Sequence, residues 1–344
     1  MIKKICHYVW DEFKGNKLYD LSDPTLNQDN RLRSFSFLKI HFEKLGIEMN
    51  TQDITSPENA DLILFENCPA KGALEKIFAI KKLNKIMYLT ISESIFILPS
   101  NNNPSIHALF DKIFTYQDQY LDDIIYFKFN YTFAFPTTIP RYVKKHKKLL
   151  CMIGRNKRVT HKGELYSERV KVIRWYEKNA SKEFSLYGEG WERPWKVAGP
   201  WFRRKVLNKW PFRPFFAKPF KCWKGQIESK AETMMEYKFS LCFENAADVS
   251  GYITEKIFDA MLAGCVPIYR GADNIAKHIP SNCFIDYRNF KNIEEMHKNL
   301  ISMKEEEYVK FLDAIEDFFN SKAADQFRYA HFVNSISIEV SKEI

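Results

Sequence analysis

Residues 5–129 alternate short apolar runs with longer segments in which apolar side chains recur every three to four positions. Short apolar runs predict buried strands, whereas a period near 3.6 residues predicts helices with one apolar face. The predicted strands are 5–9, 60–65, 85–90, 112–116 and 125–129, and the predicted helices are 33–45 and 74–83. Because strands and helices alternate, we expect a mostly parallel sheet that is covered by helices.

The alternation stops at 136–140, where the sequence reads Pro-Thr-Thr-Ile-Pro, and a basic run follows at 144–148. Prolines and a block of like charge discourage regular structure, so we expect a linker between two domains here. Beyond it the predicted strands are 149–153, 184–187, 239–244 and 266–269, and the predicted helices are 164–178 and 254–262. The pattern therefore predicts an α/β protein with two facing Rossmann-like domains, a cleft between them, and ligands at the carboxyl ends of the strands.

The length of the chain and its C-terminal pattern agree with this division. A chain of 344 residues is long enough for two cores of ordinary size. Residues 292–344 have a helical, amphipathic pattern, with apolar positions at Tyr308, Phe311, Leu312, Ile315, Phe318 and Phe319. We expect domains at 1–140 and 145–325, followed by a helical tail at 326–344.

Composition limits the class of protein. With 45% hydrophobic residues, 15% aromatic residues, 12 glycines and 14 prolines, the chain has the make-up of a packed globular protein. No apolar run approaches the roughly 20 residues of a membrane-spanning helix, and the first apolar run is too short for a signal peptide. Seven scattered cysteines without a C-x-x-C pair indicate neither a disulfide framework nor a cysteine zinc site. We therefore expect a cytoplasmic protein without a metal centre.

The net charge of +9 comes with basic clusters at 144–148, 155–162 and 203–230, which favour an anionic partner. The stretch Trp191–Trp223 holds five of the seven tryptophans among many Lys and Arg residues. Two interpretations stay open for it: a peripheral contact with the inner face of a membrane, or an insertion whose tryptophans are buried. No nucleic-acid-binding motif accompanies these residues, so we expect no nucleic-acid partner.

Residues 239–264 carry the strongest indication of chemistry, because they predict a strand, a short loop and a helix that ends at Gly264. Thr254 suits the N-cap of this helix, and Glu255 and Lys256 fall in its first turn. A helix start of this kind directs backbone N–H groups and the positive end of the helix dipole at the loop. A diphosphate can bind there, with Lys256 as an added cation. On these residues alone, an ordinary capped surface helix explains the pattern as well.

The whole segment resembles a known family. The runs F-E-N at 243–245, Y-I-T-E-K-I-F-D-A at 252–260 and L-A-G-C-V-P-I-Y at 262–269 resemble the donor-binding signature of the α-1,3/4-fucosyltransferases, glycosyltransferase family ten. The resemblance extends over 223–290 and, more loosely, over 149–191. It implies the GT-B type of fold, with an acceptor-side domain at 1–140 that carries the catalytic base and a GDP-sugar domain at 145–325.

The activity that the resemblance implies is an inverting transfer of L-fucose from GDP-L-fucose to a hydroxyl of a glycan acceptor. The expected product has an α-1,3 linkage onto a GlcNAc- or Glc-type residue, and no cofactor or metal is required. Animal family members carry a Golgi anchor, so the absence of one here points to a bacterial or viral enzyme acting on polysaccharide or lipopolysaccharide intermediates. Two alternatives stay open: another deoxysugar or amino-deoxysugar nucleotide as donor, and a sugar-binding protein without turnover.

By the same resemblance, Asn245, Tyr252, Thr254, Glu255 and Lys256 contact the donor. Glu255 would bind the fucose hydroxyls or stabilise the positive charge that develops on the sugar ring, and Lys256 would bind phosphate.

Upstream, 156–173 resembles the family's Asn…Arg pattern, in which the arginine binds the donor diphosphate, and Arg169 is the matching position. A solvated helix arginine is the alternative explanation. Three neighbours compete for the same role: Arg155, Arg158 and Arg174.

An inverting transfer also needs a general base for the acceptor hydroxyl. Glu93 follows the strand predicted at 85–90 and is our catalytic candidate, together with Glu255 for charge stabilisation. Glu66 ends the strand predicted at 60–65 and is the alternative base. Either carboxylate could instead be an ordinary structural group at a strand end.

Overall fold

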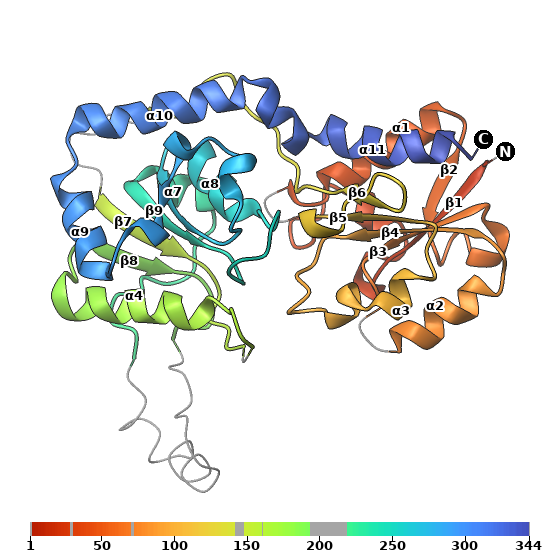
Figure 1. Ribbon diagram of the computed structural model, residues 1–344, viewed down its shortest axis with the longest axis horizontal. Coiled ribbons are helices and arrows are strands. Elements are labelled where there is room, and N and C mark those ends of the chain that lie inside the picture. The colour runs from red at the N-terminus through yellow and green to blue at the C-terminus, as the bar shows by residue number, and fades with distance from the viewer. Residues whose placement is uncertain are drawn as a thin grey trace, which may run out of the picture. The chain divides into compact units, whose positions relative to one another are not determined.

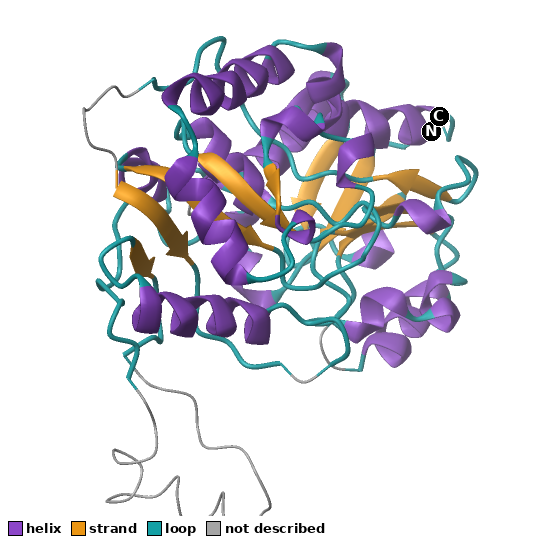
Figure 2. Ribbon diagram, turned by 60° about the vertical axis from the view of Figure 1, so that its left-hand side comes forward, coloured by secondary structure: helices purple, strands orange, loops and turns teal. Residues whose placement is uncertain are grey.

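The computed structural model describes residues 2–27, 30–69, 72–141, 148–159, 161–192 and 219–343. Chain contacts divide it into two units. The first consists of Met1–Phe135, Ser250–Ile253 and Ser321–Ile344, and the second consists of Pro136–Val249 and Thr254–Asn320. Each unit has one parallel sheet with helices on both faces (Figures 1 and 2). The C-terminal segment that the sequence presents as a separate tail thus belongs to the first unit.

The first sheet has the strand order β2-β1-β3-β4-β5-β6, and every neighbouring pair is parallel. Its strands are β1 (Lys4–Tyr8), β2 (Glu48–Thr51), β3 (Leu62–Glu66), β4 (Ile86–Ile91), β5 (Lys112–Thr115) and β6 (Tyr126–Lys128). The helices are α1 (Arg33–Lys44), α2 (Ala73–Lys81), α3 (Pro104–His107) and α11 (Tyr329–Ser341). The strand order reverses between β1 and β3, the point beyond which ligands bind in open α/β sheets.

Apolar burial explains these elements. All five residues of β3 are buried, as expected for a strand with helices on both faces. Helix α1 buries Phe35, Leu38 and Phe42, and Phe35 makes an edge-to-face contact with Phe332 of α11 at 5.7 Å between ring centroids. In the first sheet, strand β2 was not predicted from the sequence, because Met49 is its only apolar residue; its pairing with β1 makes it a strand.

The second sheet has the order β11-β10-β9-β7-β8 and is also parallel throughout. Its strands are β7 (Lys148–Ile153), β8 (Phe184–Tyr187), β9 (Tyr237–Phe243), β10 (Val266–Arg270) and β11 (Ile285–Asp286). The helices are α4 (Tyr166–Asn179), α7 (Lys230–Met235), α8 (Glu255–Leu262), α9 (Ile293–Ser302) and α10 (Glu305–Phe319). Here the order reverses between β7 and β9, so the carboxyl end of β9 is the expected place for a ligand.

Gly264 follows α8, as the sequence predicts. Its φ is +63°, the left-handed conformation that commonly ends a helix. A Cβ at this position would lie 1.9 Å from the carbonyl oxygen of Pro140, so only glycine fits. The remaining predicted strands and helices are confirmed, with ends that differ by a few residues.

Candidate functional site

Glu244 is the centre of a polar cluster at the carboxyl end of β9. Its side chain is fully buried, and its two carboxylate oxygens accept hydrogen bonds from the backbone N–H of Thr254 at 2.8 Å and from the Thr254 hydroxyl at 2.7 Å. Lys256 Nζ lies 3.2 Å from Glu244 Oε2. A buried carboxylate is tolerated only when hydrogen bonds and a cation compensate for lost water. Glu244 therefore holds the beginning of α8 against the end of β9.

Thr254 occupies the N-cap position of α8, as predicted, but it does not cap the helix with its side chain. Its hydroxyl is bound to Glu244 instead. A helix start offers N–H groups and a positive partial charge that a side-chain cap would otherwise use. The start of α8 therefore keeps the character of an anion-binding site.

Lys256 and Glu255 form an ion pair next to this helix start, with 3.2 Å between Lys256 Nζ and Glu255 Oε1. Burial lowers the pKa of Lys256, but Glu244 and Glu255 outweigh burial and hold that pKa above its usual value. Burial raises the pKa of Glu255, but Lys256 and Lys230 lower it to about 2 overall. Both side chains are therefore charged at neutral pH, and Glu255 is a very weak base.

Arg169 reaches the same cluster from α4. The residue is buried, and its Nη2 donates to the carbonyl oxygens of Phe243 at 2.6 Å and Glu244 at 2.7 Å, and to Asn245 Oδ1 at 3.2 Å. The guanidinium also lies 4.7 Å from the ring centroid of Tyr166. Arg169 thus places a positive charge next to Glu244 and Asn245, the two residues that follow β9.

Two of the competing arginines lie elsewhere. Arg155 forms an ion pair with Glu189 and is mostly exposed. Arg174 pairs with Glu177 and donates to the carbonyl oxygen of Pro219. Neither contact involves β9 or the start of α8, so the geometry favours Arg169 for the predicted role.

Tyr252 differs from the other predicted donor-binding residues, because Ser250–Ile253 belongs to the first unit. Its ring is buried and lies 4.8 Å from the ring of Tyr116 between centroids. The preceding Gly251 has a φ of +80°, and a Cβ there would lie 2.0 Å from the carbonyl oxygen of Tyr116. The structure therefore brings together Arg169, Asn245, Thr254, Glu255 and Lys256, and it packs Tyr252 against Tyr116.

Two charged residues at the strand ends of the second sheet have no role in the prediction from sequence. Glu244 enters it only as part of the F-E-N run at 243–245. Arg270, the last residue of β10, forms two hydrogen bonds with the carboxylate of Asp248, at 2.7 and 2.9 Å. Their position directly at the end of a buried strand was the available signal.

In the first unit, the predicted base Glu93 lies two residues beyond β4 and is half-buried. Its backbone N–H donates to Asn67 Oδ1 at 2.8 Å, and its Oε1 accepts from the backbone N–H of Ser94 at 2.8 Å. The carboxyl group is therefore oriented by the backbone of its own turn. Part of the residue is exposed to solvent at this strand end.

Glu66, the alternative base, is buried at the end of β3. Its carboxyl oxygens contact the hydroxyl groups of Thr90 and Ser92, and Oε1 accepts from Asn67 Nδ2 at 3.1 Å. Burial raises the pKa of Glu66 to about 7, against the opposing effect of the two hydroxyl groups. Both oxygens are thus engaged inside the unit, which makes Glu66 a less accessible base than Glu93.

We expect Glu66 to make the free energy of unfolding decrease as pH rises. The folded protein retains the Glu66 proton up to about pH 7, whereas the unfolded chain releases it near pH 4.5. This stabilisation is complete below pH 4.5 and is lost as pH rises through 7, by about 3 kcal/mol at most. Urea unfolding of the wild type and of Glu66→Gln, measured between pH 4.5 and 7, gives this contribution to stability. The same pH dependence in both proteins would contradict the raised pKa of Glu66.

Most of the tryptophan-rich stretch, residues 193–218, lies outside the described residues, and both interpretations of it, a membrane contact and a buried insertion, fall largely there. At its two ends, the indole N–H groups of Trp191 and Trp223 donate to the carbonyl oxygens of Gly154 at 2.6 Å and Gly188 at 2.9 Å. Both tryptophans are therefore anchored in the second unit. Within the described part of the chain, no helix has the length and apolarity to cross a membrane.

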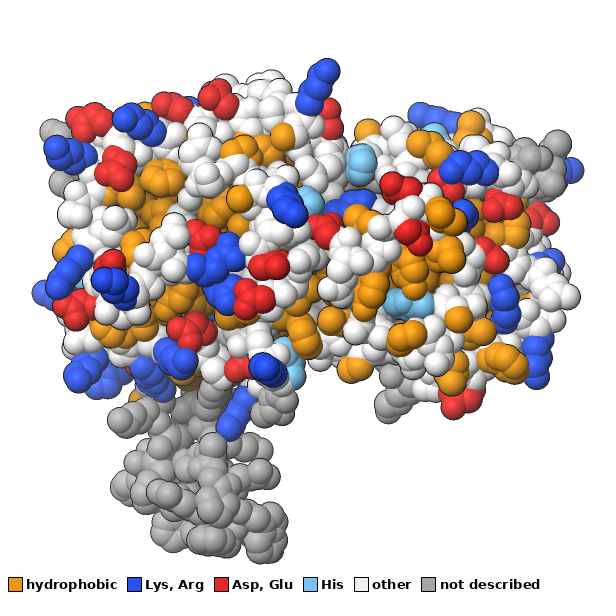
Figure 3. All heavy atoms as spheres, viewed as in Figure 1, with side chains coloured by type: hydrophobic (Ala, Val, Ile, Leu, Met, Phe, Trp, Pro, Cys, Tyr) orange, Lys and Arg blue, Asp and Glu red, His pale blue; other side chains and the backbone are white. Residues whose placement is uncertain are grey.

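One face of the molecule has mixed charges. Among the described residues on the face shown in Figure 3, Lys and Arg side chains lie among Asp and Glu side chains and do not form one continuous basic patch.

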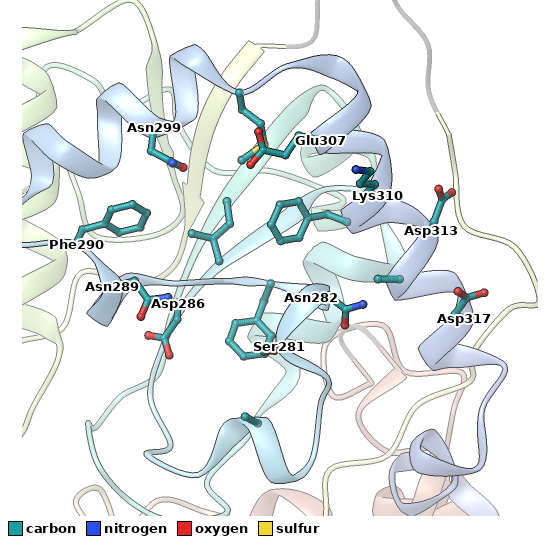
Figure 4. A pocket seen from close by; sticks show the side chains of 16 residues that line it. Ser281, Asn282, Asp286, Asn289, Phe290, Asn299, Glu307, Lys310, Asp313 and Asp317 are labelled. Atoms are coloured by element: carbon teal, nitrogen blue, oxygen red, sulfur yellow. The ribbon is translucent and has the colours of Figure 1, made fainter.

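A groove of about 1030 Å³ runs beside β11 in the second unit (Figure 4). Its lining includes the apolar side chains of Phe284, Phe290 and Phe311 and the acidic side chains of Glu307 and Asp317. None of the residues predicted to bind the donor or to act as base lines it. The candidate site is therefore the cluster around Glu244 and not this groove.

Solved structures of glycosyltransferases share the fold over nearly the whole chain. A crystal structure of an α1,3-fucosyltransferase covers 97% of this chain and 90% of its own, with a TM-score of 0.55 and 15% identity. A lipopolysaccharide outer core galactosyltransferase covers 99% and 100%, with a TM-score of 0.54 and 9% identity. With its two Rossmann-like units, the chain has the GT-B fold, as predicted.

Sequence comparison finds similarity to one family in the C-terminal part of the chain. Residues 215–335 match the model of glycosyltransferase family 10 (fucosyltransferase), C-terminal part. The chain is 42% identical to the α-(1,3)-fucosyltransferase FucT of Helicobacter pylori over 69 residues, 20% of this chain and 14% of the relative. It is 44% identical to an α-(1,4)-fucosyltransferase of Arabidopsis thaliana over 63 residues, 18% of this chain and 16% of the relative. The matches thus span a small part of these relatives, and the likeness to glycosyltransferase family 10 covers residues 215–335.

Proposed function

We propose that this chain is an inverting glycosyltransferase that transfers L-fucose from GDP-L-fucose to a hydroxyl group of a glycan. The observation that carries the proposal is the cluster of Glu244, Thr254, Glu255, Lys256 and Arg169, which lies inside or contacts the family 10 segment. A crystal structure of an α1,3-fucosyltransferase with GDP-fucose has a TM-score of 0.50 and 13% identity to this chain. Because relatives are named for 3-linked transfer, we extend the proposal to an α-1,3 linkage onto GlcNAc- or Glc-type residues.

The proposed reaction is a single displacement. The acceptor oxygen forms a bond to the anomeric carbon of fucose while the bond from that carbon to the diphosphate oxygen breaks. GDP leaves with the electron pair of the broken bond, and Glu93 takes the proton of the acceptor hydroxyl. Attack from the opposite face converts the β-linked donor into an α-linked product.

Three charged residues of the cluster, Lys256, Arg169 and Glu255, have a role in this scheme. Lys256 and the start of α8 stabilise the negative charge of the departing diphosphate, and Arg169 adds positive charge at the end of β9. Glu255 stays ionised, since its pKa is lowered to about 2, and it stabilises the positive charge of the oxocarbenium-like transition state.

A panel of nucleotide sugars tests the donor. A ligand that binds only the folded protein raises the unfolding temperature by mass action, so GDP-fucose should stabilise the chain more than UDP- or ADP-sugars do. A larger effect of another GDP-deoxysugar or amino-deoxysugar would change the donor assignment. Binding of GDP-fucose without turnover in the presence of acceptors would indicate a sugar-binding protein and contradict the proposal.

We expect transfer to continue in excess EDTA. In this scheme the negative charge of the diphosphate is neutralised by Lys256, Arg169 and the start of α8. In metal-dependent enzymes a divalent cation neutralises this charge. Initial rates with EDTA and with added Mn²⁺ measure this. A complete loss of transfer in EDTA that Mn²⁺ restores would contradict the proposed roles of these residues.

A further inference from the structure

Asn67 connects the ends of two neighbouring strands in the first unit. It follows β3, and its Oδ1 accepts hydrogen bonds from the backbone N–H groups of Ser92 at 2.9 Å and Glu93 at 2.8 Å. Its Nδ2 donates to Ser92 Oγ at 2.8 Å and to Glu66 Oε1 at 3.1 Å. One buried carboxamide thus binds both successive N–H groups of the turn that carries the proposed base.

A second carboxamide completes the support. Asn101 is fully buried, and its Nδ2 donates to Asn67 Oδ1 at 2.9 Å and to the carbonyl oxygen of Glu93 at 3.2 Å. Its Oδ1 accepts from the backbone N–H of Cys68 at 2.9 Å. The N–H and the carbonyl oxygen of Glu93 are therefore both bound by buried side chains.

We propose that Asn67 is a positioning residue that, with Asn101, fixes the backbone of Glu93 so that its carboxylate meets the acceptor hydroxyl. This inference rests on the proposed function, in which Glu93 is the base. Proton transfer requires a heavy-atom distance near 3 Å, and a displacement of about 1 Å can lower the rate of such a step by about 10²-fold. A buried network in which each polar group has a partner can hold a side chain to this precision.

The conformation of Asn67 allows a clean substitution. Its φ is +61°, a left-handed conformation that asparagine and glycine adopt more readily than other residues. Asn67→Gly therefore removes the carboxamide, and glycine can adopt the same backbone conformation without strain. Asn84 has a similar φ of +53° at a turn after α2, so Asn84→Gly is a matched control with the same change and no contact to Glu93.

The experiment measures transfer from GDP-fucose by wild type, Asn67→Gly, Glu93→Gln and the double variant. We expect Asn67→Gly to lower kcat by about 10²-fold, with the affinity for GDP unchanged and with the rate of Asn84→Gly near that of the wild type. A residue that acts through Glu93 has little further effect once Glu93 is lost, so Asn67→Gly should change the Glu93→Gln rate by less than about threefold.

Other outcomes overturn the inference. An equal loss from Asn67→Gly in both backgrounds would indicate general structural damage, and an unchanged kcat would remove the positioning role while leaving the proposed function intact. If wild type transfers no fucose, the proposed function itself fails and the positioning role fails with it. Should Asn67→Gly not fold, Asn101→Ala replaces it in the same comparison with Glu93→Gln and the double variant. Asn101→Ala removes the hydrogen bonds to Asn67 and to the carbonyl oxygen of Glu93.

Discussion

Glu93→Gln is expected to lower the rate of fucose transfer by about 10²- to 10⁴-fold and to leave the affinity for GDP nearly unchanged. The amide keeps the size of the side chain, and its oxygen can still accept from the backbone N–H of Ser94, as Glu93 Oε1 does at 2.8 Å. The effect therefore reports the loss of a base and not a loss of packing. Steady-state rates and GDP titrations of the two proteins give both quantities.

Glu66→Gln is the matched control for this prediction, because Glu66 is a carboxyl group at the end of the neighbouring strand. Its loss should lower the rate by less than about tenfold, since the hydroxyl groups of Thr90 and Ser92 can accept from an amide as well as donate to a carboxylate. A larger loss in Glu66→Gln than in Glu93→Gln would move the base to Glu66. Near-normal rates in both variants would show that neither Glu93 nor Glu66 is the general base.

Lys256→Ala has the second large effect, on donor affinity. A charge-assisted contact to phosphate contributes roughly 1.5 to 3 kcal/mol, so we expect GDP to bind about 10- to 150-fold more weakly. Stability also falls, because buried Glu244 loses the cation that lies 3.2 Å from its Oε2. Calorimetric titration with GDP, at a temperature where the variant is fully folded, separates the two effects.

Lys298→Ala is the control for Lys256→Ala, since Lys298 forms an exposed ion pair with Glu294 on α9. Surface pairs of this kind contribute little to stability, and we expect GDP to bind Lys298→Ala as it binds wild type. An unchanged affinity for GDP in Lys256→Ala would remove the phosphate-binding role of Lys256.

The periodicity of the chain predicted most of the fold because strands such as β3 and β4 are almost wholly apolar and buried. Strand β2 has a single apolar residue, Met49, so its pairing partner and not its own pattern makes it a strand. Tertiary pairing of this kind overrides local preference and cannot be predicted from a short segment alone.

Residues of the candidate site could be predicted from the sequence where they are contiguous or match a family pattern. Thr254, Glu255 and Lys256 stand together at the start of α8, and Arg169 matched an upstream pattern. The role of Glu244 was missed because its bonds reach Thr254, 10 residues further on. Asn67 was missed for the same reason, because its partners Ser92 and Glu93 are 25 and 26 residues away. Long-range hydrogen bonds leave no periodic signal in a sequence.

The most direct test of the central claim is a transfer assay with GDP-fucose and glycans that end in 4-galactosyl-N-acetylglucosamine, the acceptor type in the names of several relatives. Released GDP and the fucosylated glycan are quantified together, and NMR of the product determines the anomeric linkage. The account predicts GDP and product in equal amounts and an α-linked fucose. Turnover of a different nucleotide sugar with none of GDP-fucose, or a β-linked product, would contradict it.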